Sequence, residues 1–563
     1  MAAPSLPCAN CRPDGINCQN PGKSACANCR LVVYCSSECQ KVHWPIHKID
    51  CKSSLNKKSW EPEWIVQNRA PTFRNDDPIT HFGGVKYLWG NVTTLDVLKL
   101  DANEGEEYGG SLSLLFAASG DMRNVVKTIA QLPQGWDKPI AITINDREFD
   151  IVARNAIMLL VALAVDDKDE AIDCIIHIWY SSFIRKSDLN ILEQQVRPLI
   201  QAVCDKIKNK PTSRVLRKSW TFGTRSFQLT LSKSRWYQML SFLAVPTDLT
   251  LKQAGKIRKA VTLAKSQIDY RHRHYLFIPP AHRVAQQRFK EDGILQSFGA
   301  GRSKFTVPSP TFFHCTGNWP MPDGACPLDG WSLNEVEMAS NGMATSDIFG
   351  KLFSYFCSVL KSFLTRISNL EFTFRLFQQD AVDLPKHLEN ASFDRIEVSN
   401  ASDAAYLGIP RTIILMAPLL RPPTENPRAT LITLFMNAIT EHKIIEDDFA
   451  DLRTPSPTME RLFKYLPVTR LPLSDHDSLT TKQTFGIDLV RNYDYIVDRF
   501  ANRLQFNRYP ECMQAELKDQ NTIIERWLTK PKLQLGQDGA QEEFYRLLAS
   551  ATGKEFYLEW KRV

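Results

Sequence analysis

The cysteines of this chain are concentrated at one end, and their spacing restricts what that end can fold into. Eight of the 14 cysteines lie in the first 51 residues. Seven of these eight, with one histidine, form the pairs Cys8-x2-Cys11, Cys26-x2-Cys29, Cys35-x3-Cys39 and His47-x3-Cys51. Four such pairs supply enough ligands for two tetrahedral zinc sites. Because about 50 residues bury little core, we expect the metal to supply much of this segment's folding energy.

Zinc is favoured over two other uses of these cysteines. A disulfide framework requires an oxidising compartment, and Met1–Pro7 shows neither the basic nor the apolar part of a secretory signal. Iron–sulfur clusters are held by cysteine thiolates, whereas a histidine near the end of the series fits zinc better. No stretch approaches 18 uninterrupted apolar residues. We therefore expect an intracellular zinc protein of the nucleus or cytoplasm, neither secreted nor membrane-spanning.

The cysteine-rich segment resembles a MYND-type zinc finger. The matching features are the eight ligand residues, the stretch 33–40 (Val-Tyr-Cys-Ser-Ser-Glu-Cys-Gln), Trp44 and His47-Lys48. In that family the two sites interleave as a cross-brace. The resemblance therefore implies one zinc held by Cys8, Cys11, Cys35 and Cys39, and a second zinc held by Cys26, Cys29, His47 and Cys51. Closed four-ligand sites of this kind are structural rather than catalytic.

Two further residues in this segment are of ligand type but are not assigned as ligands. Cys18 lies in the 14-residue interval between Cys11 and Cys26, which is long for the family. We interpret Cys18 as a non-ligand in an inserted loop. On a helix, His43 shares one face with His47, because the two are four residues apart. The family spacing favours His47 as the ligand, and we expect His43 at the surface.

Fingers of this family usually dock short proline-containing peptides, and the resemblance implies that Gln40 and Trp44 form the peptide groove. The two residues are four apart and share one side of the expected helix. An exposed tryptophan beside an amide suits a proline-rich ligand, whose preset backbone costs little entropy to bind. The alternative is that Trp44 only packs over the zinc sites.

Beyond a connector at residues 53–80, residues 81–190 alternate between strand and helix patterns. Apolar runs at 113–118 and 139–144 predict strands, and the stretches 122–132 and 151–165 predict helices. This order is typical of a parallel α/β unit, in which ligands bind at the carboxyl ends of the strands. Gly120, Asp121 and Asp146 occupy those positions and are candidate cofactor ligands. One glycine is a weak signal for a cofactor turn, and both aspartates also suit helix caps.

This part of the chain resembles an uncharacterised domain that fungi fuse to MYND fingers. The same domain forms the N-terminal part of an axonemal dynein assembly factor. The matching stretches are Tyr87–Asn91, Asn103–Gly105, Ser119–Asn124, Asn145–Arg147 and Val152–Asn155. The resemblance implies a methyltransferase-like, Rossmann-like α/β fold with no established catalytic activity.

The rest of the chain is expected to complete this body around a basic insertion. Residues 346–500 are predicted to be the second half of the α/β domain, with strands at 393–400 and 412–417 and a helix at 431–439. Residues 501–563 are predicted to form a C-terminal helical segment. Residues 191–300 are predicted to be a basic helical region. Residues 301–345 are rich in proline and aromatic residues and are predicted to form a loop that wraps a core or serves as a docking site.

The charge of the chain is unevenly distributed. Residues 185–290 contain 22 Lys and Arg against 5 Asp and Glu, a balance of +17, whereas the whole chain carries +7, so the remainder sums to −10. Aromatic residues such as Trp220, Phe227, Trp236 and Tyr237 are interleaved with these charges. A basic surface with exposed rings would bind RNA or another polyanion. Alternatively, the charges face solvent or pair with the acidic C-terminal half.

Two classes of function remain, and the adaptor class is favoured. The first is a zinc-binding adaptor that recruits proline-containing partners in transcription or complex assembly. The second is an S-adenosylmethionine-dependent methyltransferase in the α/β body, which the glycine-poor turn disfavours. A SET-type lysine methyltransferase is excluded, because that domain carries an Asn-His-x-Cys stretch and no Asn-His dipeptide occurs here. Nucleic-acid binding through residues 185–290 is a third, less favoured possibility.

Overall fold

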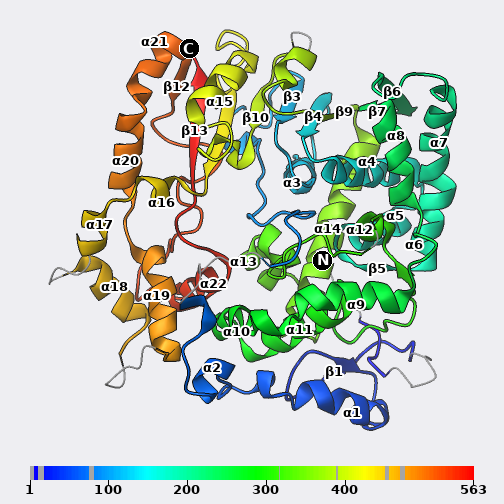
Figure 1. The fold of residues 1–563 in the computed structure, drawn as a ribbon, viewed down its shortest axis with the longest axis vertical. Coiled ribbons are helices and arrows are strands. Elements are labelled where there is room, and N and C mark those ends of the chain that lie inside the picture. Colours follow the sequence, from blue (N-terminus) through cyan, green and yellow to red (C-terminus); the bar gives the residue numbers. More distant parts are fainter. Residues whose placement is uncertain are drawn as a thin grey trace. The chain divides into compact units, whose positions relative to one another are not determined.

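The computed structural model of the protein describes residues 6–10, 18–74, 82–315, 317–388, 391–450, 456–468 and 476–563. The chain divides into two units, each assembled from segments that are far apart in the sequence (Figure 1). The first, here called the finger unit, comprises residues 1–94, 153–214 and 232–364. The second, the sheet unit, comprises residues 95–152, 215–231 and 365–563. Among the described residues, no helix is both long and apolar enough to cross a membrane.

The finger unit is mainly helical, with two short antiparallel strand pairs, β1–β2 and β5–β8. Its strands are β1 (Ser24–Ala25), β2 (Val33–Tyr34), β5 (Phe183–Ile184) and β8 (Val307–Pro308). Its helices are α1 (Ser37–Cys51), α2 (Glu63–Val66), α5 (Lys168–Tyr180), α6 (Lys186–Ile191), α7 (Arg197–Lys206), α8 (Lys233–Met239), α9 (Leu251–Thr262), α10 (Ile268–Phe277), α11 (Pro280–Asp292), α12 (Pro310–Phe313) and α13 (Leu333–Met338). Helices α4 (Phe149–Ala164) and α14 (Ile348–Asn369) have residues in both units.

The sheet unit contains a nine-stranded sheet in the order β12-β13-β11-β10-β3-β4-β9-β7-β6. The strands are β3 (Leu112–Phe116), β4 (Ile140–Asp146), β6 (Val215–Phe222), β7 (Arg225–Ser232), β9 (Phe372–Gln378), β10 (Arg395–Glu397), β11 (Thr430–Phe435), β12 (Ala515–Leu517) and β13 (Phe556–Arg562). The helices are α3 (Arg123–Ala130), α15 (Ile409–Met416), α16 (Ala438–His442), α17 (Ile445–Ala450), α18 (Pro457–Tyr465), α19 (Ser478–Val490), α20 (Asp494–Arg503), α21 (Tyr509–Met513) and α22 (Ala540–Ser550).

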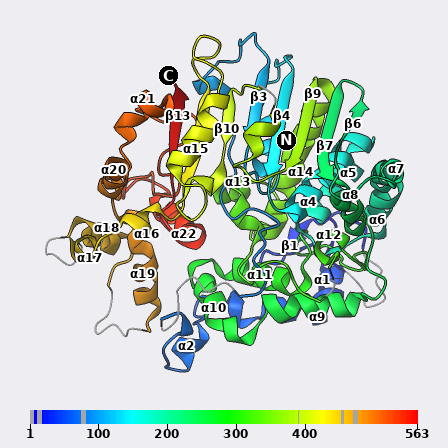
Figure 2. The same ribbon diagram turned by 45° about the horizontal axis from the view of Figure 1, so that its top comes forward.

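The sheet is mixed, and its central part is parallel. Six consecutive strands of the sheet are parallel to one another, in the order β11, β10, β3, β4, β9 and β7. Strand β13 is antiparallel to both β11 and β12. Figure 2 shows β3, β4, β9, β7 and β6 side by side. Strands β4 and β9 lie on one side of β3 in the sheet, and β10 and β11 lie on its other side. The direction in which strands are added along the chain therefore reverses between β3 and β10.

The local predictions for the first half of the α/β body are confirmed. Strands β3 and β4 and helices α3 and α4 form where the apolar runs and the helical periodicity placed them. On the β10 side of the sheet, a buried core joins Ile396 and Leu431 to apolar residues of α15, α16 and α20. Residues from both predicted halves therefore share one sheet.

Two predictions for the second half of the α/β domain are wrong. The predicted strand is largely a helix, and most of the predicted helix is a strand. Residues 412–417, predicted as a strand, belong mostly to α15, which begins after Gly408 and carries Pro410 in its first turn, a favourable position for proline. Of residues 431–439, predicted as a helix, 431–435 belong to β11, in which every residue is buried, and 438–439 begin α16. A strand buried on both faces lacks the alternation that distinguishes strand from helix.

Three segments also differ from the predicted domain plan. The C-terminal segment 501–563 contributes strands β12 and β13 to the sheet as well as helices. The basic region contributes β6 and β7 at the sheet edge, so it is not entirely helical. The described part of the predicted connector is folded, since Trp64 is fully buried and Arg69 binds both carboxylate oxygens of Asp269 on α10.

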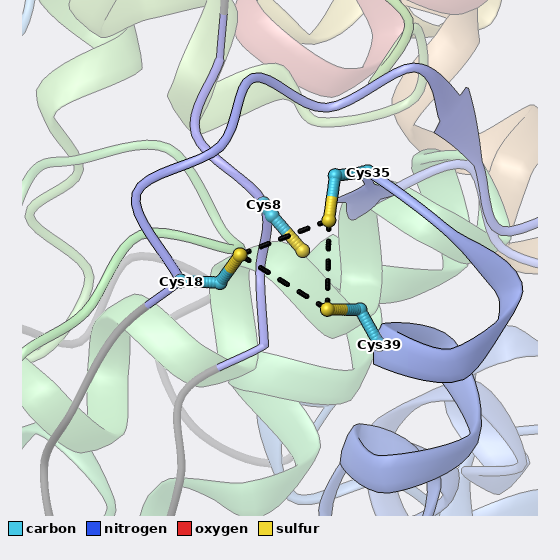
Figure 3. A group of neighbouring side chains, drawn as sticks. All are labelled: Cys8, Cys18, Cys35 and Cys39. Atoms are coloured by element: carbon cyan, nitrogen blue, oxygen red, sulfur yellow. Dashed lines mark hydrogen bonds between the residues drawn. The ribbon is translucent and has the colours of Figure 1, made fainter.

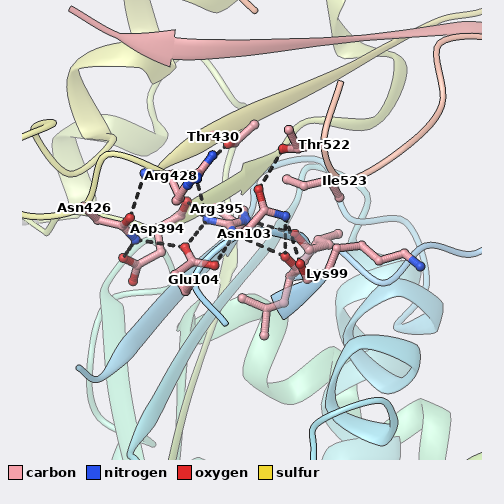
Figure 4. A network of polar contacts seen from close by, with 12 residues as sticks. Lys99, Asn103, Glu104, Asp394, Arg395, Asn426, Arg428, Thr430, Thr522 and Ile523 are labelled. Carbon is pink, nitrogen blue, oxygen red and sulfur yellow. Dashed lines mark hydrogen bonds and ion pairs between the residues drawn. The ribbon is translucent and has the colours of Figure 1, made fainter. Parts of the chain in front are cut away.

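A buried ion pair explains one of the motifs noted in the sequence, Asn103–Gly105. Glu104 binds Arg395 through two hydrogen bonds of 2.8 and 2.6 Å, and both side chains are almost completely buried (Figure 4). Asn426 donates to both Glu104 and Asp394, and Thr522 donates to Asn103. The network joins four segments of the chain, around residues 103, 394, 426 and 522, at the start of β10, so the motif has a structural role.

Replacing Glu104 with alanine should destabilise the sheet unit by about 3–5 kcal/mol, because Arg395 would keep a buried charge without its partner. Guanidinium unfolding followed by circular dichroism measures the change. The matched control is Glu106→Ala, since Glu106 is exposed and its loss should cost no more than about 0.5 kcal/mol. Equal unfolding midpoints for the two variants would contradict the importance of the ion pair.

Candidate metal centre and its adjoining groove

The first metal-binding cluster consists of Cys8, Cys18, Cys35 and Cys39. Their sulfur atoms point toward a common centre (Figure 3). The Sγ–Sγ distances are 3.7 Å between Cys18 and Cys35, 3.5 Å between Cys35 and Cys39, and 4.0 Å between Cys39 and Cys18. Two sulfurs bound at 2.3 Å to a tetrahedral zinc lie about 3.8 Å apart. The cluster therefore fits one zinc ion.

Cys18 corrects the interpretation of the sequence, which treated it as a non-ligand. Its backbone N–H donates to the Asn10 carbonyl oxygen at 3.0 Å, and this bond brings its thiol to the other three sulfurs. Cys11, which the family spacing implied as the fourth ligand, lies outside the described residues. The sequence signal that could have found Cys18 is the long interval before Cys26, which contains it.

The second cluster consists of Cys26, Cys29, His47 and Cys51, all of them buried. The sulfurs of Cys26 and Cys51 are 3.8 Å apart, and the Cys29 sulfur is 3.5 Å from Nε2 of His47. A sulfur and a nitrogen bound to one tetrahedral zinc lie about 3.6 Å apart. These are the four residues that the resemblance implied for the second ion. The ligands of the two clusters alternate along the chain, as in a cross-brace.

Local structure explains how the ligands are positioned. The turn after Cys26 is closed by a bond from the Arg30 N–H to the Cys26 carbonyl oxygen at 2.9 Å, with Arg30 at a φ of 52°. Helix α1 begins at Ser37 because the Ser36 hydroxyl accepts the Cys39 N–H. This helix then carries Cys39, His47 and Cys51, so it spans both clusters.

The surroundings shift the pKa values of the thiol ligands in both directions. Burial raises the pKa of the Cys8 thiol to about 12 and also raises the pKa of Cys51, whereas a hydrogen bond with Asn10 lowers the pKa of Cys39 to about 7. A metal ligand must be a thiolate, so a positive charge is needed to hold the Cys8 and Cys51 sulfurs deprotonated. Asn28 supports the second site, because its side-chain amide donates to the Cys51 sulfur at 3.2 Å. The two clusters fit two zinc ions.

His43 is not a ligand in this arrangement, but its expected position at the surface is wrong. It is 9% exposed, and its Nδ1 lies 3.0 Å from the Tyr34 hydroxyl. Its ring stacks on His47 with the ring centres 6.0 Å apart. Burial lowers the pKa of His43 to about 4, so it is neutral near pH 7. His43 therefore packs behind the metal ligand His47.

The finger is docked on the rest of the finger unit. Asp50 at the end of α1 forms an ion pair with Arg288 of α11 at 3.1 Å, and Ser346 donates its N–H to the Arg30 carbonyl oxygen. Figure 1 shows α1 beside α11. A Cβ added at Gly299 would lie 2.9 Å from the Ala9 side chain, so a glycine permits this close approach. The finger therefore has a fixed orientation within its unit.

A groove of about 640 Å³ lies beside the second cluster. The residues that line it are Cys26, Ala27, Asn28, Gln40, Trp44, Cys51, Lys52, Ser53, Asn56 and Lys57. Gln40 and Trp44 therefore lie in the same groove. Trp44 is half-buried and packs edge-on against His47, with the Lys52 ammonium 5.6 Å from its ring centre. Trp44 thus both covers the second metal site and forms part of the groove wall.

Sequence reasoning missed the other polar residues of this groove. Lys52 directly follows the last ligand, and Asn56 and Lys57 lie in the segment 53–80 that was predicted to be a connector. Asn56 donates its side-chain amide to the Cys51 carbonyl oxygen at 3.0 Å, which holds this segment against the zinc site. Its position only five residues after the last ligand, Cys51, is the signal that could have found it.

The three candidate cofactor residues lie together at the carboxyl ends of β3 and β4. Asp146 accepts the N–H of Gly120 at 2.9 Å and that of Glu148 at 2.8 Å, one on each carboxylate oxygen. Burial raises the pKa of Asp146 to about 6. Asp121 accepts the N–H and the Nε–H of Arg123 at the start of α3. These bonds give both aspartates a structural role in the turns.

Comparison with known families identifies two segments. The family described as MYND finger matches residues 8–51, and the family described as "Domain of unknown function (DUF4470)" matches residues 88–184. The chain therefore contains a zinc-binding MYND finger, a module of the protein-interaction type, followed by a domain of no assigned function. Each match covers well under half of the chain.

Curated relatives match only around the finger. The chain is 36% identical over 58 residues to the N-lysine methyltransferase SMYD2 of Gallus gallus, which is 10% of this chain and 13% of that protein. It is 39% identical over 46 residues to the SET domain and MYND-type zinc finger protein 6 of Schizosaccharomyces pombe, which is 8% of each chain. The match to N-lysine methyltransferase SMYD2-B of Xenopus laevis spans 92 residues, 21% of that protein. No solved structure matches the chain.

Replacing Cys18 with serine should reduce the zinc content of the chain from two ions to one, because the first cluster loses a thiolate. Native mass spectrometry of the full chain counts the ions. Cys512→Ser is the matched control, since Cys512 is exposed and lies far from the finger in sequence, and two ions should remain. Two ions in Cys18→Ser, together with one ion in Cys11→Ser, would instead assign the site to Cys11.

Proposed function

We propose that the protein is an adaptor whose zinc finger binds short proline-containing peptides of partner proteins. The observation that carries this proposal is the groove beside the second zinc site, in which Gln40 and Trp44 lie together. The groove is open and about 640 Å³ in volume, a size that suits a few residues of extended chain.

The chemistry of the groove supports an extended ligand. Trp44 offers a half-exposed ring, and the side-chain amides of Asn28, Gln40 and Asn56 line the same surface. A polyproline segment presents ring faces to the tryptophan and unpaired carbonyl oxygens to amide donors, and it loses little entropy on binding. The ring would bind proline, and the side-chain amide of Gln40 would fix the direction of the peptide, since those of Asn28 and Asn56 already donate to Cys51.

The charge of the groove suggests a preference among such peptides. Lys52 and Lys57 are exposed at its edge, and no carboxylate is present among the described residues that line it. A peptide with Asp or Glu beside its prolines would pair with these lysines, which would raise the association rate and the specificity. We therefore propose that the partners carry a proline motif flanked by acidic residues.

We infer that the sheet unit is of the methyltransferase-like, Rossmann-like class and acts as a scaffold. The order β9-β4-β3-β10-β11 corresponds to the 3-2-1-4-5 order of doubly wound sheets, with β3 as the first strand. The structural bonds of Asp146 and Asp121 argue against a cofactor in the usual crevice. The methyltransferase names of the relatives concern proteins that share only the finger region with this chain.

Binding of RNA through residues 185–290 is less favoured, because three of the four aromatic rings singled out in the sequence are buried. Trp220, Phe227 and Trp236 are each at most 8% exposed, whereas a stacking surface needs accessible rings. Tyr237 is 40% exposed and is the ring of this set that a base could reach. A regulatory role in transcription or in complex assembly follows from the adaptor proposal. Thiolate zinc sites also suit the reducing nucleus or cytoplasm.

Trp44→Ala should weaken binding of a proline-rich, acidic peptide by about 30-fold, since a central tryptophan commonly contributes about 2 kcal/mol. Gln40→Ala should weaken it less. Fluorescence anisotropy of a labelled peptide, titrated with the zinc-loaded full chain, measures both effects.

Lys41→Ala is the control, because Lys41 is an exposed residue of α1 that does not line the groove. All three variants should retain two zinc ions. The adaptor proposal would be refuted at this groove if Trp44→Ala retained full affinity, or if no proline-rich peptide bound at millimolar concentration. Exchange of the acidic residues for glutamine tests the charge preference separately.

A further inference from the structure

A second pocket, of about 310 Å³, lies in the finger unit, and its lining shares no residue with the zinc clusters or the groove. Its walls come from the Tyr87–Asn91 motif, helices α10 and α11, and the loop 322–329. These segments belong to three sequence features that the finger does not explain: the family motif, the basic region and the stretch rich in proline and aromatic residues. The pocket is where the three features meet.

Backbone pairing holds two of these walls together. The Asp323 N–H donates to the Phe82 carbonyl oxygen at 2.9 Å, and the Gly84 N–H donates to the Met321 carbonyl oxygen at 3.2 Å. A Cβ on residue 84 would lie 2.0 Å from the Pro320 carbonyl oxygen, so only glycine permits this approach. The motif that begins at Tyr87 is thus fixed against the loop that carries Asp323.

The pocket contains a buried ammonium group with few acceptors. Lys290 of α11 is 8% exposed, and its Nζ donates to the Asp323 carbonyl oxygen at 2.7 Å. An ammonium has three N–H donors, so this bond uses one of them. Burial lowers the pKa of Lys290, which shows the cost of placing this charge away from water. Arg271 and Arg273 of α10 add two more cations to the lining.

Trp89 provides a second donor that the described residues do not use. Its side chain lines the pocket and is 4% exposed, and its indole Nε1–H has no acceptor among the described residues. The ring packs against Tyr180 and Phe312, with ring centres 5.7 and 5.8 Å away. Buried indole N–H groups are normally hydrogen-bonded. Trp89 and Lys290 therefore offer unused N–H groups in one pocket.

The remaining lining provides aromatic faces and two carboxylates. Tyr87 and Tyr270 contribute phenol rings, and the Arg273 guanidinium lies 5.4 Å from the Tyr270 ring centre. Asp323 and Asp329 are the acidic residues of the lining. Burial lowers the pKa of His274 to about 4, so this histidine is neutral near pH 7. The lining then carries three cations against two carboxylates.

We propose that this pocket binds a nucleoside monophosphate. Lys290 and Arg271 would bind the phosphate, and the tyrosine rings would stack on the base. Asp323 and Asp329 would accept the sugar hydroxyls, as an acidic residue does in dinucleotide sites. The volume is at the lower end for small-ligand sites, which favours a mononucleotide over a dinucleotide. The proposal is independent of peptide binding by the finger.

The test is isothermal titration of the zinc-loaded full chain with AMP, GMP, CMP and UMP, and with adenosine and inorganic phosphate in parallel. At least one monophosphate should bind with a dissociation constant below 1 mM, and more tightly than adenosine or phosphate alone. Lys290→Met and Arg271→Gln should each weaken that binding by at least about 10-fold, because a hydrogen bond to a charged group is lost.

Lys290→Met keeps the backbone carbonyl that accepts from Arg258, and it removes a buried charge, so the fold should be retained. Lys259→Met is the control, since Lys259 is exposed on α9 outside the pocket. Absence of binding by every monophosphate at 10 mM would overturn the proposal. So would equal affinity for inorganic phosphate, or binding that Lys290→Met and Arg271→Gln leave unchanged.

Discussion

Coordination of zinc is the interaction on which the functional part of this structure depends. The finger's own apolar core is small and centres on Leu31, Val33 and Tyr34, so the metal bonds must hold its loops to α1. The groove uses the same atoms, because Cys26 and Cys51 are both zinc ligands and groove residues. Loss of the second zinc would therefore remove the groove as well as the fold. The proposed peptide binding would therefore be thermodynamically linked to metal binding, and each would strengthen the other.

The contacts between the finger and the rest of the finger unit fix the orientation of this groove within that unit. The Asp50–Arg288 ion pair and the segment after Cys51 hold α1 against the helices of the finger unit, and the Trp60 ring lies beneath the Arg283 guanidinium at 4.7 Å. A finger on a free linker would sample many orientations, whereas a peptide that bound in this groove, as we propose, would be held at a fixed place on a large unit. That arrangement suits a scaffold, because a partner held there has a defined position relative to the rest of the unit.

Features that depend on local spacing can be predicted from the sequence. Features that depend on contacts between distant segments of the chain cannot. The ligands of the second cluster come together because of the spacing within their two pairs. Cys26 and Cys29 have the spacing of a short turn, and His47 and Cys51 share one face of a helix. Cys18 was misjudged because it stands outside the four regularly spaced pairs, and the long interval that contains it does not show where its thiol lies. The same limit explains β11 and α15, since an apolar run without alternation fits either state until neighbouring strands are known. The rings of Trp220 and Phe227 are buried by the sheet edge, which charge counting does not reveal.

Buried polar groups are satisfied to different degrees at two places in the chain. At the carboxyl ends of β3, β4 and β10, the carboxylates of Asp121, Asp146 and Glu397 each accept backbone N–H groups of the adjoining turns. One oxygen there, Oε2 of Glu397, is buried without a hydrogen-bond partner among the described residues. In the pocket of the finger unit, the indole N–H of Trp89 likewise has no acceptor among the described residues, and the Lys290 ammonium donates to the Asp323 carbonyl oxygen. Because unsatisfied buried donors are costly, they persist where an external acceptor repays them. The Trp89 donor is therefore the reason to seek a ligand in the pocket of the finger unit.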